Sequence, residues 1–162
     1  MRQLVLFRHA KAVPSAPDLD DFERELAEAG RLAAPRIAEA LAEAGATPKI
    51  ALVSDARRTR QTWELAQSAF PETKVRYLHS LYLCDAETLM AEAEHARASH
   101  VLIVAHNPGL HDLAARLAHR NTEPEMRVRA KFPTAAAAIF GRKSNDASWK
   151  LAEFFTPKDL GA

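Results

Sequence analysis

The sequence predicts an α/β fold, a three-layer α/β/α sandwich in which helices cover both faces of a mostly parallel central sheet. Short apolar runs alternate with segments of helical periodicity, as they do in repeated βα units. Near the end of the chain, two apolar segments instead follow each other across a short turn-like stretch, which indicates a hairpin. Because 162 residues is the length of one ordinary domain, we expect a single domain over residues 1–162.

The first strand is expected at about residues 3–8, and a polar loop follows it. Small and apolar residues then recur at three- and four-residue spacing and predict an amphipathic helix. They are Leu26, Ala29, Ala33, Ile37, Leu41 and Ala44. Pro35 lies inside this pattern, so we expect either a kink or a helix that begins only a few residues before the proline.

The middle of the chain predicts two further strands, at 50–53 and at 75–78, with a helix between them at about 55–70. Asp85, with Thr88 three residues later, is typical of a helix N-cap, and we expect that helix to run to about residue 98.

Residues 101–105 form the most apolar predicted strand and are expected at the centre of the sheet. Pro108 suits the first turn of the helix that follows. Segments 135–140 and 149–154 are the two strands of the expected hairpin.

Composition narrows the class of protein. With 22 basic and 21 acidic residues the net charge is about +1, which argues against a nucleic-acid-binding face. Cys84 is the single cysteine, so an intrachain disulfide is excluded and a reducing compartment is favoured. We see neither a secretory signal nor a membrane-length apolar run, so we expect a soluble, cytoplasmic protein.

Three predicted strands end on residues of matching chemistry. Arg8 and His9 follow the first strand, Ser54 and Arg58 follow the second, and His106 follows the strand at 101–105. Because ligands of parallel sheets bind where the carboxyl ends of the strands meet, we expect these side chains to share one pocket.

Their chemistry suits a phosphoryl group. Two arginine forks match phosphoryl oxygens and stabilise their charge during transfer. A histidine between them can attack phosphorus and hold the group covalently if its ring is neutral, and adjacent arginine charge favours the neutral form. The second histidine can donate hydrogen bonds to the oxygens or move a proton to or from water.

The three blocks resemble motifs of a known family. Phe-Arg-His-Ala-Lys at 7–11 resembles the Arg-His-Gly or Arg-His-Ala signature of the histidine phosphatase superfamily. Residues 54–62 are similar to its Ser-x-x-x-Arg-x-x-x-Thr pattern, and 104–109 to its distal histidine motif. The short length, residues 21–26 with Gly30 and the tail 132–134 resemble more narrowly the SixA-type phosphohistidine phosphatases.

The resemblance implies a phosphoglycerate mutase-like fold without a lid domain. We expect no metal, because His106 and His111 lie five residues apart and not the four of a helical zinc pair, and no organic cofactor. It implies that His9 is the nucleophile, that Arg8 and Arg58 clamp the phosphoryl oxygens and that His106 completes the pocket. Two weaker candidates for substrate contacts are Arg24 and Asn107.

Two departures from the family pattern stand out. Larger superfamily members usually carry a general acid in an insertion over the pocket, whereas the short region 81–84 offers no acid before Asp85. This absence is tolerable if the leaving group is an imidazole that departs already protonated. Ala27 stands where related sequences often have a Ser or Thr helix cap, a loss of about 1 kcal/mol.

The expected function is hydrolysis of phosphohistidine on a partner protein, such as a phosphorelay or phosphotransfer component, by a monomer with no nucleic-acid or membrane partner. The alternatives are a small-molecule phosphatase of the same superfamily, favoured if residues 12–20 form an ordered flap, and a non-catalytic phosphate-binding module. Arg57 lies about 100° from Arg58 around the predicted helix, so we expect it to be a surface charge or an ion-pair partner.

Overall fold

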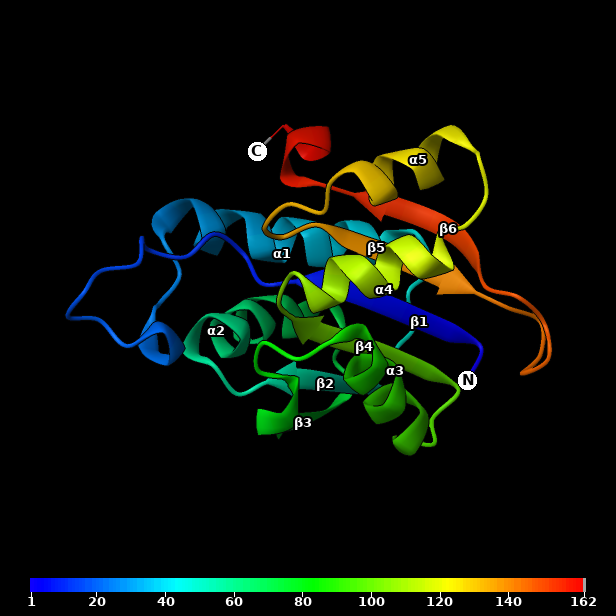
Figure 1. Cartoon of the computed structure of the whole chain (residues 1–162), viewed down its shortest axis with the longest axis horizontal. Coiled ribbons are helices and arrows are strands. Elements are labelled where there is room, and N and C mark those ends of the chain that lie inside the picture. The colour runs from blue at the N-terminus through cyan, green and yellow to red at the C-terminus, as the bar shows by residue number, and fades with distance from the viewer. Residues whose placement is uncertain (162) are drawn as a thin grey trace.

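The computed structural model describes residues 1–161, and its centre is one six-stranded sheet in the order β3-β2-β4-β1-β5-β6. The strands are β1 (Gln3–Arg8), β2 (Ile50–Ser54), β3 (Lys74–Leu78), β4 (His100–Ala105), β5 (Ala137–Gly141) and β6 (Lys150–Phe155). The first four are mutually parallel, whereas β5 runs antiparallel to β1, and β6 antiparallel to β5 (Figure 1). The predicted central strand is β4, between β2 and β1.

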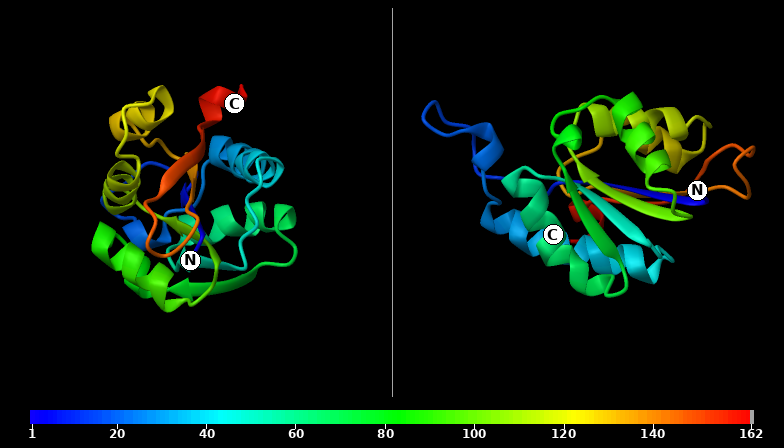
Figure 2. Two further views of the ribbon diagram at one scale, coloured as in Figure 1. Left: turned by 90° about the vertical axis from the view of Figure 1, so that its right-hand side faces the viewer. Right: turned by 90° about the horizontal axis from the view of Figure 1, so that it is seen from below.

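Helices cover both faces of the sheet, so the predicted sandwich is confirmed (Figure 2). They are α1 (Glu28–Glu43), α2 (Arg57–Ala66), α3 (Ala86–His95), α4 (Gly109–Leu117) and α5 (Glu123–Ala130), with short 3-10 turns at 21–23, 67–69, 79–81 and 157–160. Within residues 1–161, none of the helices is both long enough and apolar enough to cross a membrane.

The core has two halves, one on each face of the sheet. Along β1, the alternate residues Leu4 and Leu6 pack with α3, α4 and α5, whereas Val5 and Phe7 pack with α1 and α2. All four are fully buried, as expected for a strand with helices on both sides. Packing on both faces sets the position of β1, and with it the position of Arg8 at the carboxyl end of the strand.

Helix α1 departs from the prediction in two ways. It begins at Glu28 and continues through Pro35 without interruption, so it starts about two turns before the proline. Ala29 and Ala44 are exposed, and the buried stripe instead runs through Gly30, Ala33, Ala34, Ile37, Ala38 and Leu41. Gly30 is required there, because a Cβ at this position would lie 2.2 Å from the carbonyl oxygen of Lys11.

Helices α2 and α3 end earlier than expected, and α5 was not predicted. Helix α5 has eight residues and lacks an apolar stripe, since only Glu125 and Val128 are buried. Its signal is a Thr-x-x-Glu cap: the Thr122 hydroxyl accepts from the Glu125 amide at 3.3 Å and donates to its carboxylate at 2.7 Å. Asp85 caps α3 as predicted, by accepting from the Thr88 amide.

Candidate active site

The parallel strands bring both site histidines to one edge of the sheet. In the β1–β4 ladder Arg8 lies opposite Ala105, and the His9 amide donates to the Ala105 carbonyl at 3.1 Å. His9 and His106, the next residues of each chain segment, therefore become neighbours, with ring centroids 5.4 Å apart. The sequence prediction that these strand ends meet is confirmed.

Arg58, in the first turn of α2, also lies at this site. Its side chain is 2% exposed, a degree of burial that is unusual for an arginine. Thr62, one turn later, donates to the Arg58 carbonyl at 2.7 Å and accepts from the Ala10 amide at 3.0 Å. This hydroxyl ties α2 to the segment that carries His9, which places the arginine beside the histidine.

The adjacent Arg57 behaves as the helix geometry predicts. Its side chain is 49% exposed and pairs with Glu25 at 3.2 Å. The two neighbouring arginines therefore have opposite environments, and only Arg58 faces the histidines.

His9 is poised as a nucleophile. Its Nδ1 lies 2.8 Å from the Ala10 carbonyl, which can only accept, so Nδ1 carries the proton and Nε2 keeps its lone pair. The pKa of His9 is lowered to about 3, mainly by burial and also by the charges of Arg58, Arg8 and Arg24. The expected neutral ring is confirmed, but burial, which the sequence did not reveal, is the largest cause.

His106 is also neutral, and Ser54 orients it. The His106 Nε2 lies 2.7 Å from the Ser54 hydroxyl, while its Nδ1 is buried without a hydrogen-bond partner. Burial lowers the pKa of His106 to about 2, with His9 and Arg58 adding to the effect. The ring of Tyr82 meets the His106 ring edge-on at 5.5 Å.

Unpartnered polar atoms gather in this pocket. The Nε atoms of Arg8 and Arg58 and the Nδ1 of His106 are buried and make no hydrogen bond. Folded proteins rarely leave buried polar groups unsatisfied. The two guanidinium N–H groups are donors, as is a protonated Nδ1, so an oxyanion bound between them would satisfy all three.

Asn107 has a different orientation from the one expected of a phosphate ligand. Its amide nitrogen donates to the Phe132 carbonyl at 2.9 Å, and that carbonyl also accepts from Arg8 Nη1 at 3.1 Å. The buried Oδ1 of Asn107 remains unpartnered. Since an oxygen acceptor repels phosphoryl oxygens, the free end of Asn107 suits a water or another donor.

Asp21, whose role the sequence analysis missed, lies beside the arginines. Its carboxylate accepts from the Tyr82 hydroxyl at 2.6 Å, from Arg24 Nε at 3.0 Å and from Arg58 Nη2 at 3.1 Å. The Tyr82 hydrogen bond is the largest cause that lowers the pKa of Asp21 to about 2, followed by Arg24 and Arg58, so the group is ionised at neutral pH. Arg24 also donates to the Val13 carbonyl at 2.8 Å.

No three His, Cys, Asp or Glu side chains within residues 1–161 are arranged to hold a metal ion. The side chains that the structure gathers at this site are the two histidines, Arg8, Arg58 and the Asp21 carboxylate.

Comparisons with known proteins agree with this geometry. No family model matches the chain. An uncharacterized chloroplastic protein of Arabidopsis thaliana is 27% identical over 178 residues, which cover 96% of this chain and 78% of that protein. A candidate phosphohistidine phosphatase SixA from Agrobacterium tumefaciens is 31% identical with a TM-score of 0.83, over 96% of this chain and 98% of that one.

Two other solved structures share the fold. A candidate phosphohistidine phosphatase SixA from Nakamurella multipartitia is 26% identical, with a TM-score of 0.82 over 96% of both chains. The protein histidine phosphatase SixA complexed with tungstate is 23% identical, with a TM-score of 0.78 over 98% of this chain and 99% of that one. With the Agrobacterium identity spanning nearly both whole chains, the protein is a phosphatase of the histidine phosphatase superfamily and belongs to its SixA-type branch.

Proposed function

We propose that the protein hydrolyses phosphohistidine on partner proteins through a phosphorylated His9. The observation that carries this proposal is the protonation state of the pocket. His9 and His106 are neutral at neutral pH, and Asp21 is ionised. Among the described residues, none of these three groups can act as a general acid in the free enzyme, so the pocket suits a leaving group that needs no added proton.

Phosphohistidine meets that requirement. When its second ring nitrogen is protonated, attack by His9 Nε2 on phosphorus breaks the substrate P–N bond, and the bonding electrons stay on a neutral imidazole. His9 keeps its Nδ1 proton on the Ala10 carbonyl throughout and becomes a phosphoimidazolium. Arg8 and Arg58 would stabilise the phosphoryl oxygens, and Arg24 would add positive charge. An alkyl phosphate would instead release an alkoxide, which is a far poorer leaving group.

Water then completes the cycle. It attacks phosphorus, the P–N bond to His9 breaks and its electrons return to Nε2 as the lone pair. Both water protons remain on the departing dihydrogen phosphate, so this step also balances without a separate acid. A neutral His106 whose Nε2 accepts from the Ser54 hydroxyl carries its proton on Nδ1, the atom left without a partner. We therefore assign His106 the donor role, with Nδ1–H toward the phosphoryl oxygens.

The loop that follows β1 supports a protein substrate over a small metabolite. Residues 12–20 project away from the body of the molecule, beyond α2 and the end of β1 (Figures 1 and 2). Most of these residues are exposed, whereas an ordered flap closed over the site would favour a small-metabolite enzyme. A protruding phosphohistidine of a cytoplasmic phosphorelay or phosphotransfer protein is the substrate that we infer.

A rapid-quench experiment at pH 7 tests the proposal, with a ³²P-phosphohistidine protein as donor. Label should appear on His9 and then drain to free phosphate, and His9→Ala should acquire none. The same enzyme should hydrolyse an alkyl phosphate at least ~10²-fold more slowly, because a missing general acid is worth 10²–10⁴ in rate. Phosphate release without label on His9, or an equal rate on the alkyl phosphate, would contradict the proposal.

A further inference from the structure

Arg58 presents two separate hydrogen-bonding edges, and one is already occupied. A guanidinium carries five N–H donors in a rigid plane. Arg58 Nη1 donates to the Asp21 carbonyl at 2.7 Å, and Nη2 donates to the Asp21 carboxylate at 3.1 Å. Asp21 therefore holds the terminal edge of the guanidinium. The lateral edge, made of Nε–H and the second N–H of Nη2, is left, and its Nε is buried without a partner.

The Asp21 carboxylate is itself fixed from two other sides. Tyr82 donates to Oδ2 at 2.6 Å, and Arg24 donates to Oδ1 at 3.0 Å. The Tyr82 ring is in turn held edge-on between Phe22, at 5.0 Å, and His106. One carboxylate thus joins two arginines and the tyrosine that packs on the second histidine.

These hydrogen bonds fix the orientation of the Arg58 guanidinium, and no proton has to be transferred for them to do so. A long arginine side chain loses much rotamer freedom when one edge is fixed, and positioning errors of about 1 Å can cost ~10²-fold in rate. Asp21 is ionised at neutral pH, so its part is to hold the arginine and not to supply a proton.

We propose that Asp21 is a positioning residue for phosphoryl transfer, which orients Arg58 so that its free lateral edge meets the phosphoryl group. The proposal rests on the phosphatase function above and adds a residue to it. The Asp21 contacts engage Nη1 and Nη2 and leave the buried Nε of Arg58 unpartnered, so the arginine is held in place with one donor free for a phosphoryl oxygen.

The test compares Asp21→Ala and Asp21→Asn with Asp18→Ala, an exposed carboxylate of the projecting loop. We expect Asp21→Ala to lower kcat/KM by about 10- to 100-fold, mainly in kcat, because the arginine acts most strongly on the transition state. Asp21→Asn keeps one side-chain acceptor and should recover part of the loss. Asp18→Ala should stay within about twofold of the parent enzyme.

A double-mutant cycle separates positioning from a purely structural effect. In an Arg58→Ala background, adding Asp21→Ala should have little further effect on kcat/KM, because the side chain to be oriented is gone. Equal losses with and without Arg58, or no loss from Asp21→Ala alone, would overturn the proposal. A second result would also overturn it. If Asp21→Asn is as impaired as Asp21→Ala and its kcat/KM no longer falls at alkaline pH, Asp21 acts as a proton donor.

A tungstate-binding assay tests the role of Asp21 independently of which substrate the enzyme hydrolyses. Tungstate affinity, measured by calorimetry, should fall in Asp21→Ala and stay unchanged in Asp18→Ala whether or not phosphohistidine is turned over. If the parent enzyme binds tungstate and Asp21→Ala binds it equally well, Asp21 does not orient Arg58. If tungstate binding depends on Asp21 but phosphohistidine is not hydrolysed, the substrate assignment fails and the positioning role stands.

Discussion

The arginines at the two edges of the parallel sheet differ in their hydrogen bonding. At the amino edge, a cleft of about 690 Å³ is lined by the chain start, the turn before β4 and the β5–β6 hairpin. There Arg142 donates from Nε to the Met1 carbonyl at 2.9 Å and stacks on Trp149 at 4.3 Å. At the carboxyl edge, Arg8 and Arg58 each leave a buried Nε without a partner.

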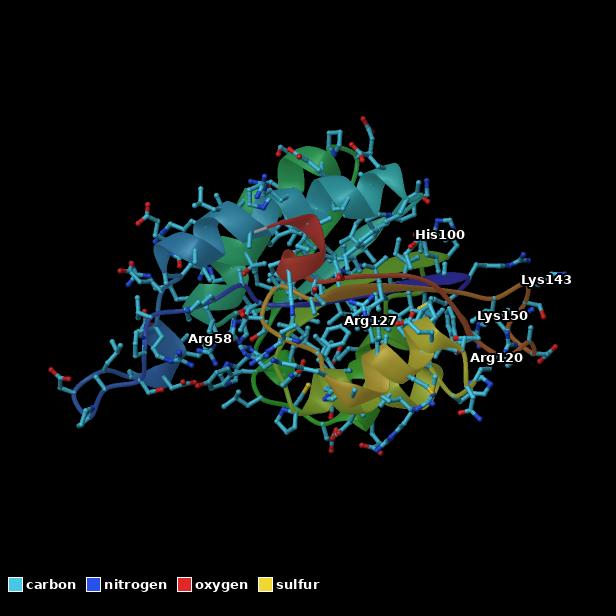
Figure 3. The ribbon with its side chains drawn as sticks, turned by 90° about the horizontal axis from the view of Figure 1, so that it is seen from above. Arg58, His100, Arg120, Arg127, Lys143 and Lys150 are labelled. Carbon is cyan, nitrogen blue, oxygen red and sulfur yellow. The ribbon has the colours of Figure 1, made fainter. Side chains whose placement is uncertain are left out.

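The difference shows that buried hydrogen-bond donors without partners indicate the active site better than the volume of a cleft does. The amino-edge cleft is large, but each side-chain nitrogen of its Arg142 donates to an oxygen of the protein. The carboxyl-edge arginines remain unsaturated beside two neutral histidines. In Figure 3, Arg58 lies left of the centre of the molecule and Lys143, a residue of the hairpin, lies at its right end.

Removing the nucleophile should give the largest effect. His9→Ala should lower turnover by roughly 10⁴-fold or more, as removal of a covalent nucleophile does elsewhere. Because the arginine donors remain, tungstate affinity should change by less than about tenfold. Parallel kinetics and calorimetry measure both quantities. Loss of tungstate binding together with turnover would show that His9 holds the oxyanion and would weaken the distinction between donor and nucleophile.

The neighbouring arginines of α2 sharpen the comparison. Arg58→Lys should lower kcat/KM by about 10²- to 10³-fold, because an ammonium cannot reproduce the planar fork that contacts both Asp21 and the phosphoryl group. Arg57→Lys makes the same chemical change one residue earlier, where the side chain is half exposed, and should stay within about threefold. Similar losses in the two variants would remove Arg58 from the site.

The buried histidines also predict how stability depends on pH. Their folded pKa values, about 3 for His9 and about 2 for His106, lie below the value of 6.5 for a free histidine. The unfolded chain therefore binds more protons at acidic pH. Stability should be fully present above about pH 6.5 and should fall as pH drops toward 3, by up to ~1.4 kcal/mol per pH unit for each histidine.

Urea denaturation at pH 7, 5.5 and 4.5 measures this slope. His9→Gln should remove about half of the part that the two histidines contribute. His95→Gln, at an exposed position beside the amino-edge cleft, is the matched control variant. A slope that survives His9→Gln intact would mean that His9 is protonated in the folded protein at these pH values.

A change at the amino edge should have the smallest effect on activity. Arg142→Ala removes its hydrogen bonds to Met1 and Asn145 and its stacking on Trp149. We expect the free energy of unfolding to fall by about 1 kcal/mol, with kcat/KM within about twofold of the parent. A large loss of activity at unchanged stability would give the amino edge a role in the reaction and contradict the comparison.

Much of the site followed from the sequence, because parallel strands deliver their last residues to one edge. Arg8, His9 and His106 are adjacent to strongly apolar runs, and the helical period separates Arg58 from Arg57. These are local signals. The central place of β4 and the β5–β6 hairpin were predicted from apolar runs and turn residues, whereas the full strand order came only from the structure.

The remaining features depend on long-range packing. Tyr82 and Asp21 are 61 residues apart, so no local pattern joins them. His9 is buried where its amide donates to the Ala105 carbonyl and its own carbonyl accepts from the Ala135 amide, and this burial is the largest cause of its lowered pKa. Helix α5 escaped prediction because it buries little apolar surface, and only its Thr122 cap marked it. Ser54 could have been assigned a role, since it ends β2 at the same edge.

The β1–β4 register requires the same number of residues between the paired positions and the histidine in each strand. Leu4 pairs with Val101, and His9 and His106 each come five residues after their member of that pair. Inserting one residue into either strand would turn one histidine away from the other, because alternate residues face opposite sides of a sheet. Changes of length are thus confined to the segments between the strands. A designer could graft loops there while the two strand ends keep their histidines matched.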